Sequence, residues 1–140
     1  MASAERDAIL MRLREFFAQP PQGTAAVYLY GSVARGDSRP GSDVDVAILF
    51  DEDPPRTLDG LHVGIADSLQ AALGRPVDLV VLNHASPDLV HRVLRDGILV
   101  SEPNRSGRVR FEVRLRNDYF DMEPIRERYR RPAAQGTAAR

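Results

Sequence analysis

The sequence predicts an α/β domain in which a small β-sheet is covered by helices. Segments whose apolar residues recur at helical spacing alternate along the chain with short, mostly apolar runs of strand length. The 140 residues, 43% hydrophobic and 28% charged, suit one soluble domain with a substantial core. No repeat or long linker divides the chain, so we expect a single domain over residues 1–131 and a disordered tail over 132–140.

The first predicted elements are a helix and a strand. A helix is expected over residues 3–18, where Ser3 can cap the N-terminus and the apolar residues form one stripe. That stripe consists of Ile9, Leu10, Leu13, Phe16 and Phe17. The run 19–23 contains two prolines and a glycine and ends the helix. Residues 25–30 are mostly apolar and predict the first strand.

A short helical turn over residues 32–37 and a loop over 38–41 follow, and 43–50 predict the second strand. Asp53 before Pro54 is typical of a helix start. The helix after it is expected to end at Gly74. Its apolar side contains Leu58, Leu61, Ile65, Leu69, Ala72 and Leu73.

The remaining elements complete the alternation of strands and helices. Residues 76–82 predict the third strand. Ser86 and Pro87 open a helix that ends at Gly97, and a short strand over 98–100 follows it. A long helix is expected over 107–130. Its stripe is Phe111, Leu115, Tyr119, Met122, Ile125 and Tyr129, and Pro124 is expected to kink or divide it.

Composition excludes several classes of protein. The formal net charge of −1 gives no overall attraction to nucleic acid or to a membrane surface. No apolar run approaches the roughly 20 residues of a membrane helix, and the N-terminal pattern is not that of a signal peptide. All 19 basic residues are arginine and there is no cysteine, so Schiff-base lysine chemistry and thiolate chemistry are excluded. We expect a cytoplasmic protein.

Two aspartates stand at the head of the second predicted strand. Alternate side chains of a strand share a face, so Asp43 and Asp45 point the same way, while Val44 and Val46 point into a core. Adjacent carboxylates repel each other unless a cation lies between them. Oxygen ligands favour Mg²⁺ or Mn²⁺ over zinc or copper.

A glycine–serine pair ends the first predicted strand. Gly31 allows the backbone to approach a ligand closely, and Ser32 offers a hydroxyl group. Backbone N–H groups at such a turn can bind phosphate. Together with Asp43 and Asp45, the pair indicates a site for a metal ion and a nucleotide.

This pattern resembles the signature of the nucleotidyltransferase superfamily related to DNA polymerase beta. The signature is a Gly-Ser pair, a short helix, a loop, Asp-x-Asp on the next strand, and a third carboxylate on a later strand, a place that Asp78 fits here. The neighbours Val77, Leu79 and Val81 alternate with Asp78, so it can point away from the core. The resemblance implies a small mixed β-sheet flanked by helices.

The resemblance also implies roles for these residues. Asp43, Asp45 and Asp78 would be the metal ligands and catalytic residues, with two Mg²⁺ ions and ATP as the substrate. Asp43 and Asp45 would hold the ion on the triphosphate, and Asp78 would lie nearest the attacking hydroxyl and could take its proton. Gly31 and Ser32 would bind the β- and γ-phosphates.

Two neighbouring residues leave alternatives open. Arg35 can contact phosphate or pair with Asp37, because arginine–aspartate pairs are common on surfaces. Ser42 can contact the nucleotide or orient the turn before Asp43. The short length of the chain beyond residue 82 leaves little room for the extra domains with which polymerases of the superfamily hold nucleic acid.

The size and the C-terminal sequence resemble the minimal nucleotidyltransferase (MNT) group. Its members pair with helical HEPN proteins, which are RNase toxins, and act as antitoxins by transferring AMP from ATP to a toxin tyrosine. The similar segments are Leu82-Asn83, Ser86-Pro87, and the region of Phe111, Tyr119 and Asp121. The resemblance thus implies a HEPN partner, without direct binding to nucleic acid or membrane.

Other functions stay open at the level of sequence. The protein can neutralise a partner by contact alone, or adenylylate a small molecule. The segment 105–131 carries nine arginines against five acidic residues. This segment is either a solvated helix or a docking face for an acidic partner or RNA.

Overall fold

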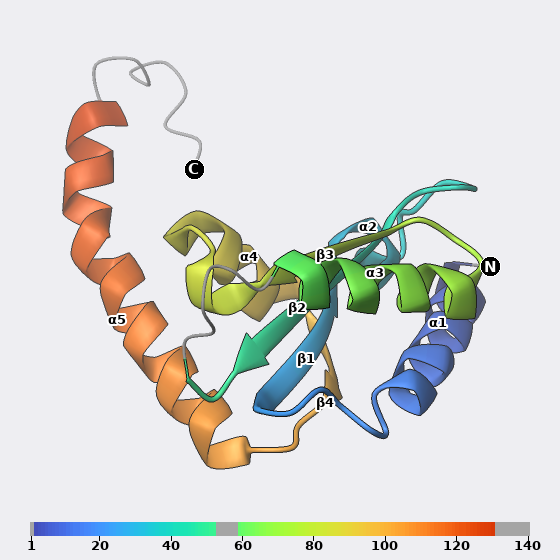
Figure 1. Ribbon diagram of the computed structural model, residues 1–140. Helices are drawn as coiled ribbons and strands as arrows, with labels where there is room; N and C mark the ends of the chain where they lie inside the picture. Colours follow the sequence, from blue (N-terminus) through green and yellow to red (C-terminus); the bar gives the residue numbers. More distant parts are fainter. Residues whose placement is uncertain (1, 53–58, 131–140) are drawn as a thin grey trace.

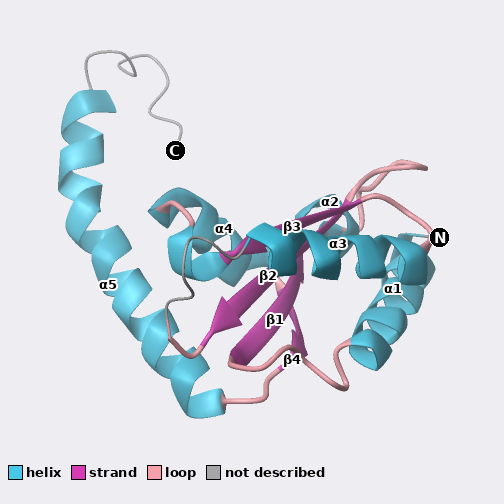
Figure 2. Cartoon of the chain, viewed as in Figure 1, coloured by secondary structure: helices cyan, strands magenta, loops and turns pink. Residues whose placement is uncertain are grey.

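The computed structural model describes residues 2–52 and 59–130, and the side chains of 3–52 and 64–117 within them. Its elements, in order, are α1 (Ala2–Phe16), β1 (Thr24–Tyr30), α2 (Gly31–Arg35), β2 (Val44–Phe50), α3 (Asp59–Leu73), β3 (Val77–Val81), a 3₁₀ turn (Leu82–His84), α4 (Pro87–Asp96), β4 (Ile98–Ser101) and α5 (Arg105–Arg130). Figures 1 and 2 show the helices around the sheet.

The expected helices and strands are confirmed, with most ends shifted by one or two residues. The capping signal at Asp53 and Pro54, and the tail 132–140, lie outside the described residues. The same holds for some side chains of the predicted stripes, namely Leu58, Leu61, Tyr119, Met122, Ile125 and Tyr129.

The four strands form one mixed sheet in the order β3-β2-β1-β4. β1 pairs antiparallel with both β2 and β4, whereas β2 and β3 are parallel. Only α2 and the short segment 36–43 separate β1 from β2, so β2 can run back antiparallel beside β1. The longer connection through α3 allows β3 to run parallel to β2. The predicted mixed sheet is therefore confirmed.

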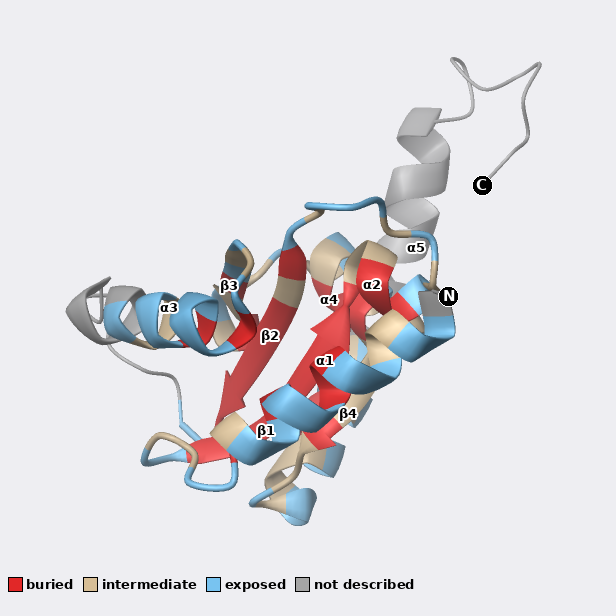
Figure 3. Ribbon diagram, turned by 90° about the vertical axis from the view of Figure 1, so that its right-hand side faces the viewer, coloured by how far each residue is buried: buried red, intermediate tan, exposed pale blue. Residues whose placement is uncertain are grey.

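Helices cover both faces of the sheet. The central strand β1 is buried along its whole length. Its alternate residues Val27 and Leu29 pack in a core with α1 and α3, and Tyr28 and Tyr30 belong to a second core with α4 and α5. Figure 3 shows buried strands between helices whose outer surfaces are exposed. Val44 and Val46 are fully buried on the first face, as expected.

Helix α5 begins earlier than residue 107, because Asn104 caps it. The Asn104 Oδ1 atom accepts a hydrogen bond of 3.1 Å from the backbone N–H of Gly107. The helix then runs without a break to Arg130. The prediction that Pro124 divides it is thus wrong, since a proline removes one helical hydrogen bond and leaves the others. At α4 the predicted cap is confirmed, with Ser86 Oγ accepting from the Leu89 N–H at 3.3 Å.

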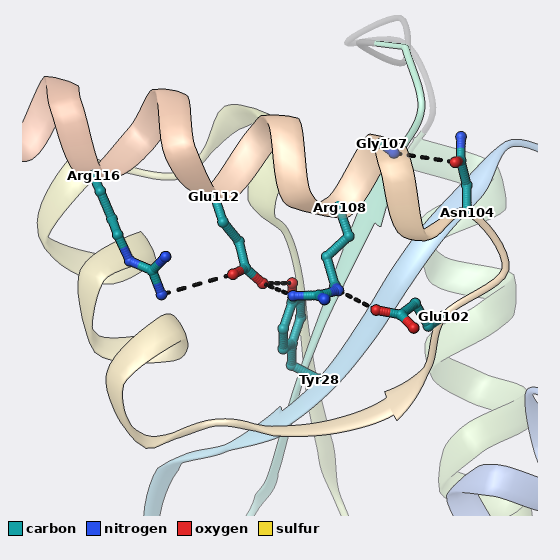
Figure 4. Close-up of polar contacts among 7 residues, drawn as sticks. All are labelled: Tyr28, Glu102, Asn104, Gly107, Arg108, Glu112 and Arg116. Carbon is teal, nitrogen blue, oxygen red and sulfur yellow. Dashed lines mark hydrogen bonds and ion pairs between the residues drawn. The ribbon is translucent and has the colours of Figure 1, made fainter.

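A polar network holds the start of α5 to the sheet (Figure 4). The buried Tyr28 hydroxyl donates to Glu112 Oε2 at 2.9 Å, and Arg108 Nη1 donates to the same oxygen at 2.6 Å. Arg108 also pairs with Glu102, and Arg116 lies 3.7 Å from the other Glu112 oxygen. Burial, and then the charge of Glu112, raise the pKa of Tyr28 well above its usual range. No described helix is long and apolar enough to cross a membrane.

Candidate active site

A pocket of about 430 Å³ lies where β1 ends and β2 and β3 begin. Five of the residues singled out from the sequence line it, namely Gly31, Ser32, Arg35, Asp45 and Asp78. The structure adds Tyr30, Val80, Leu89, Arg92 and Asp96 to the lining. The walls therefore come from the β1–α2 junction, from two parallel strands and from helix α4.

Two of the three candidate carboxylates lie side by side on one face of the sheet. Asp45 on β2 is in register with Asp78 on the parallel strand β3. Tyr30 on β1 is in register with Asp45 from the other side. Residues in register on neighbouring strands point to the same face, so three polar groups lie in a row across three strands. Two carboxylates in such a row are suited to bind one divalent cation.

Asp45 and Asp78 form the acidic floor of this pocket, where two carboxylates lie close together. Burial raises the pKa of Asp45, and the charges of Asp78 and Asp43 raise it further. Arg35 and Arg92 act in the opposite direction without reversing the shift. Ionisation of Asp45 therefore costs more than that of an exposed aspartate, and a nearby cation would offset this cost.

The pKa of the neighbouring Tyr30 is affected by the same carboxylates. Burial raises the pKa of Tyr30 to about 12, and the charges of Asp45 and Asp78 contribute to the shift. Tyr30 therefore stays protonated at neutral pH. Its ring, which is largely buried, forms part of the pocket wall.

Asp43 lies apart from the other two carboxylates. It precedes β2, which begins at Val44, and its side chain is exposed and does not line the pocket. Its charge still acts on Asp45. Among the side chains that the structure describes, no three from histidine, cysteine, aspartate and glutamate are close enough to hold one metal ion. The structure therefore brings Asp45 and Asp78 together and leaves Asp43 at the edge of the site.

Gly31 has the backbone conformation and the lack of a side chain that the turn requires. Its φ of +77° is left-handed, and an added Cβ would stand 2.0 Å from Asp45 Oδ2. Only glycine allows β1 to turn into α2 directly above the carboxylate. Ser32 follows in the first turn of α2 and lines the same pocket. The backbone at residue 31 therefore lies directly against the Asp45 carboxylate.

The two residues with open alternatives differ in their placement. Arg35 lines the pocket and also pairs with Asp37, its Nε lying 3.3 Å from Asp37 Oδ2 with both side chains exposed. Ser42 holds the turn before β2, because its Oγ accepts the Arg39 N–H at 2.9 Å and its own N–H donates to the Arg39 carbonyl at 2.9 Å. Ser42 does not line the pocket.

Sequence reasoning missed the contribution of helix α4. Leu89, Arg92 and Asp96 are spaced i, i+3 and i+7, so they share one side of the helix, and all three line the pocket. This spacing was visible in the sequence, but only the packing of α4 beside α2 and β1 shows which side faces the carboxylates. Arg92 brings a second positive charge to the site.

Residues 12–106, which include all the residues discussed for the pocket, match the family described as Polymerase beta, Nucleotidyltransferase. Protein adenylyltransferase MntA of Thermococcus cleftensis is 32% identical to this chain over 88 residues. The aligned part covers 63% of this chain and 81% of that relative.

Two solved structures share the fold. A chain of a crystal structure described as a toxin–antitoxin with AMP-PNP has a TM-score of 0.67 and 21% identity, covering 93% of this chain and 98% of that chain. A chain from the structure of tri-AMPylated Shewanella oneidensis HEPN toxin in complex with MNT antitoxin has a TM-score of 0.58 and 21% identity, covering 99% and 100%. At these identities the likeness concerns the fold.

Proposed function

This chain belongs to the polymerase beta nucleotidyltransferase family, and on that premise we propose that it transfers AMP from ATP to a hydroxyl group of a partner protein. The observation that carries the proposal is the pairing of Asp45 with Asp78 beneath the Gly31 turn. Paired carboxylates next to a backbone turn in one pocket suit a metal ion bound to a nucleoside triphosphate. The similar protein from T. cleftensis is named a protein adenylyltransferase.

The triphosphate would lie against the Gly31–Ser32 turn. Gly31 and Ser32 both line the pocket, so their backbone N–H groups can approach the phosphates, and the Ser32 hydroxyl can donate to them. Arg35 lines the same wall and can offset their charge, since its ion pair with Asp37 is exposed and weak. The pocket volume of about 430 Å³ lies within the range of about 300–1,000 Å³ that is usual for small-molecule sites.

The acidic floor fits Mg²⁺. Asp45 and Asp78 are oxygen ligands in register. Burial, and then the charges of Asp78 and Asp43, raise the pKa of Asp45, and a cation would offset the cost of ionising it. We assign Asp43, at the edge of the site, as the third ligand. Two ions would be held by these carboxylates, and when bound they would neutralise the charge on the triphosphate and on the leaving pyrophosphate.

In the transfer step, the acceptor hydroxyl would enter the pocket on the side opposite the Gly31–Ser32 turn. The acceptor oxygen attacks the α-phosphorus, the bond from that phosphorus to the bridging oxygen breaks, and pyrophosphate leaves. Asp78 can accept the proton of the attacking hydroxyl. Arg92 approaches the same carboxylates from α4 and can offset charge that develops during transfer.

We assign the acceptor as a tyrosine of a helical HEPN-type toxin, which would make this chain an antitoxin. A solved structure with the same fold is a complex of an MNT antitoxin with an AMPylated HEPN toxin. The pocket is bounded by β1, α2, β2, β3 and α4, and a side chain carried by another protein has to reach it from the exposed surface.

The position of the transferred label tests this function. The protein is incubated with Mg²⁺, the proposed HEPN-type partner, and ATP labelled at the α- or the γ-phosphate. We expect the partner to retain only the α-label, and Asp45→Asn to abolish the transfer. Label from the γ-phosphate would indicate a kinase. An unlabelled partner that stays bound and inactive would indicate an antitoxin that acts by contact, and an unlabelled partner that does not bind would favour a small-molecule acceptor.

A further inference from the structure

The segment that leads into β2 determines where Asp43 stands. Asp45 and Asp78 are fixed by strand register, but Asp43 precedes the first residue of β2 and has no partner in the sheet. Its position therefore depends on whatever holds residues 38–42. In Figure 1 this segment lies near the N-terminal end of α1 and the turn between α3 and β3.

Both ends of the segment are tied to one ion pair. Arg75 Nη1 donates to Glu5 Oε2 at 2.7 Å, and Arg75 Nη2 donates to the Ser42 carbonyl at 2.6 Å. Ser38 Oγ donates to the other oxygen of Glu5. Glu5 from α1 thus binds the start of the segment, and Arg75 binds its end, one residue before Asp43. We call these two side chains the clasp.

The clasp also reaches the strand that carries Asp78. Arg75 lies three residues before Asp78, and the carbonyl of the next residue, Pro76, accepts the Val44 N–H at 2.9 Å. The backbone on either side of Asp43 is therefore bound to the short stretch that starts β3. A movement of this stretch would shift Asp43 relative to Asp78.

Arg75 is held in an unusually constrained place. Its side chain is 18% exposed, and its Nε is buried with no hydrogen-bond partner among the described residues. Burying an unsatisfied donor is costly, so the two contacts of the terminal nitrogens have to hold the guanidinium in place. Lysine would offer one nitrogen where arginine offers a planar pair that reaches Glu5 and Ser42 separately.

We propose that Arg75 and Glu5 are positioning residues that set the place of Asp43 and, through it, the affinity of the site for a divalent cation. This proposal rests on the proposed function, since it assigns Asp43 as a ligand. Residues that orient a metal ligand commonly change metal affinity by roughly 10- to 100-fold when they are replaced.

Binding of Mn²⁺ alone, followed by the loss of the free-ion electron paramagnetic resonance signal, tests the clasp. We expect Arg75→Gln to weaken Mn²⁺ binding by roughly 10-fold or more, and Glu5→Gln, which leaves Arg75 and Ser42 in contact, to weaken it less. The amides of residues 38–44 should exchange hydrogen faster in both variants. Arg108→Gln is the matched control, because Arg108 is equally buried and forms ion pairs on the other face of the sheet.

The control separates positioning from general stability. Arg108→Gln should lower the melting temperature and leave Mn²⁺ binding unchanged. Wild-type Mn²⁺ affinity in Arg75→Gln, at any melting temperature, would overturn the clasp. If Arg75→Gln does not fold, wild-type affinity in Glu5→Gln overturns it instead. Failure of the proposed function looks different, because the wild type would then bind no Mn²⁺ or Asp45→Asn would bind it equally well.

Discussion

The backbone of Gly31 lies so close to the Asp45 carboxylate that residue 31 cannot carry a side chain. A Cβ on Gly31 would lie 2.0 Å from Asp45 Oδ2 and 2.9 Å from its Cγ. The turn after β1 and the carboxylate on β2 are therefore parts of one arrangement, in which the backbone at residue 31 closes over the acid. The proposed phosphate contact at Gly31 and the proposed metal ligand Asp45 therefore share one contact.

Gly31→Ala should impair nucleotide binding far more than Ser32→Ala. The added methyl group displaces Asp45 and strains a left-handed backbone, whereas loss of the Ser32 hydroxyl removes one hydrogen bond of about 0.5–1.5 kcal/mol. Gly23→Ala is the control, since Gly23 has a φ of +85° but its nearest neighbour, in Phe50, is 4.0 Å away. Titration calorimetry with AMP-PNP measures the affinities. Equal affinities for Gly31→Ala and Gly23→Ala would contradict the contact.

Asp45→Asn should make the metal-free protein more stable at neutral pH while abolishing AMP transfer. Burial and two acidic neighbours raise the pKa of Asp45, so its ionised form costs folding free energy. This cost is absent below its ordinary pKa and grows as pH rises through its unfolded and then its raised folded value. The wild type should therefore approach the melting temperature of Asp45→Asn as the pH falls, when melts are recorded in a chelator. A variant that melts below the wild type at neutral pH would exclude the repulsion.

Arg92→Gln should slow AMP transfer by roughly tenfold to a hundredfold, because a hydrogen bond to a charged group contributes about 1.5–3 kcal/mol. Arg110→Gln is the control, since Arg110 on α5 is exposed and does not line the pocket. Initial rates of transfer at saturating ATP measure the effect. Equal rates for the two variants would mean that Arg92 does not assist AMP transfer.

Tyr28→Phe should lower the free energy of unfolding by about 0.5–1.5 kcal/mol, because Glu112 loses a buried hydrogen bond from β1 but keeps that of Arg108. Urea unfolding measures the change. Nucleotide affinity should not change, since Tyr28 does not line the pocket. An unchanged midpoint of unfolding would mean that the network in Figure 4 does not anchor α5.

Periodicity along the chain predicted the elements and part of the site. Alternation in the strands placed Val44 and Val46 in the core, and it turned Asp45 and Asp78 away from it, as the structure shows. This rule works because only one register of a strand places its apolar side chains on the buried face. It could not show that β2 begins only at Val44, which leaves Asp43 outside the sheet.

Features set by tertiary packing were not predictable in this way. The approach of Arg92 depends on which side of α4 meets the sheet, and the clasp joins residues 70 positions apart. The cap at Asn104 lies three residues before Gly107, and a capping residue is weakly distinguished from the turn around it in sequence alone.

AMP transfer to a tyrosine of the partner is tested by measuring the intact mass of that partner. The proposed HEPN-type partner is incubated with this protein, ATP and Mg²⁺, and its intact mass is then measured, with Asp78→Asn as the matched inactive enzyme. We expect the wild type to add a mass of one or more whole AMP units, located on tyrosine by fragmentation, and Asp78→Asn to add none. A partner of unchanged mass that is nevertheless bound and silenced by the wild type would contradict this expectation.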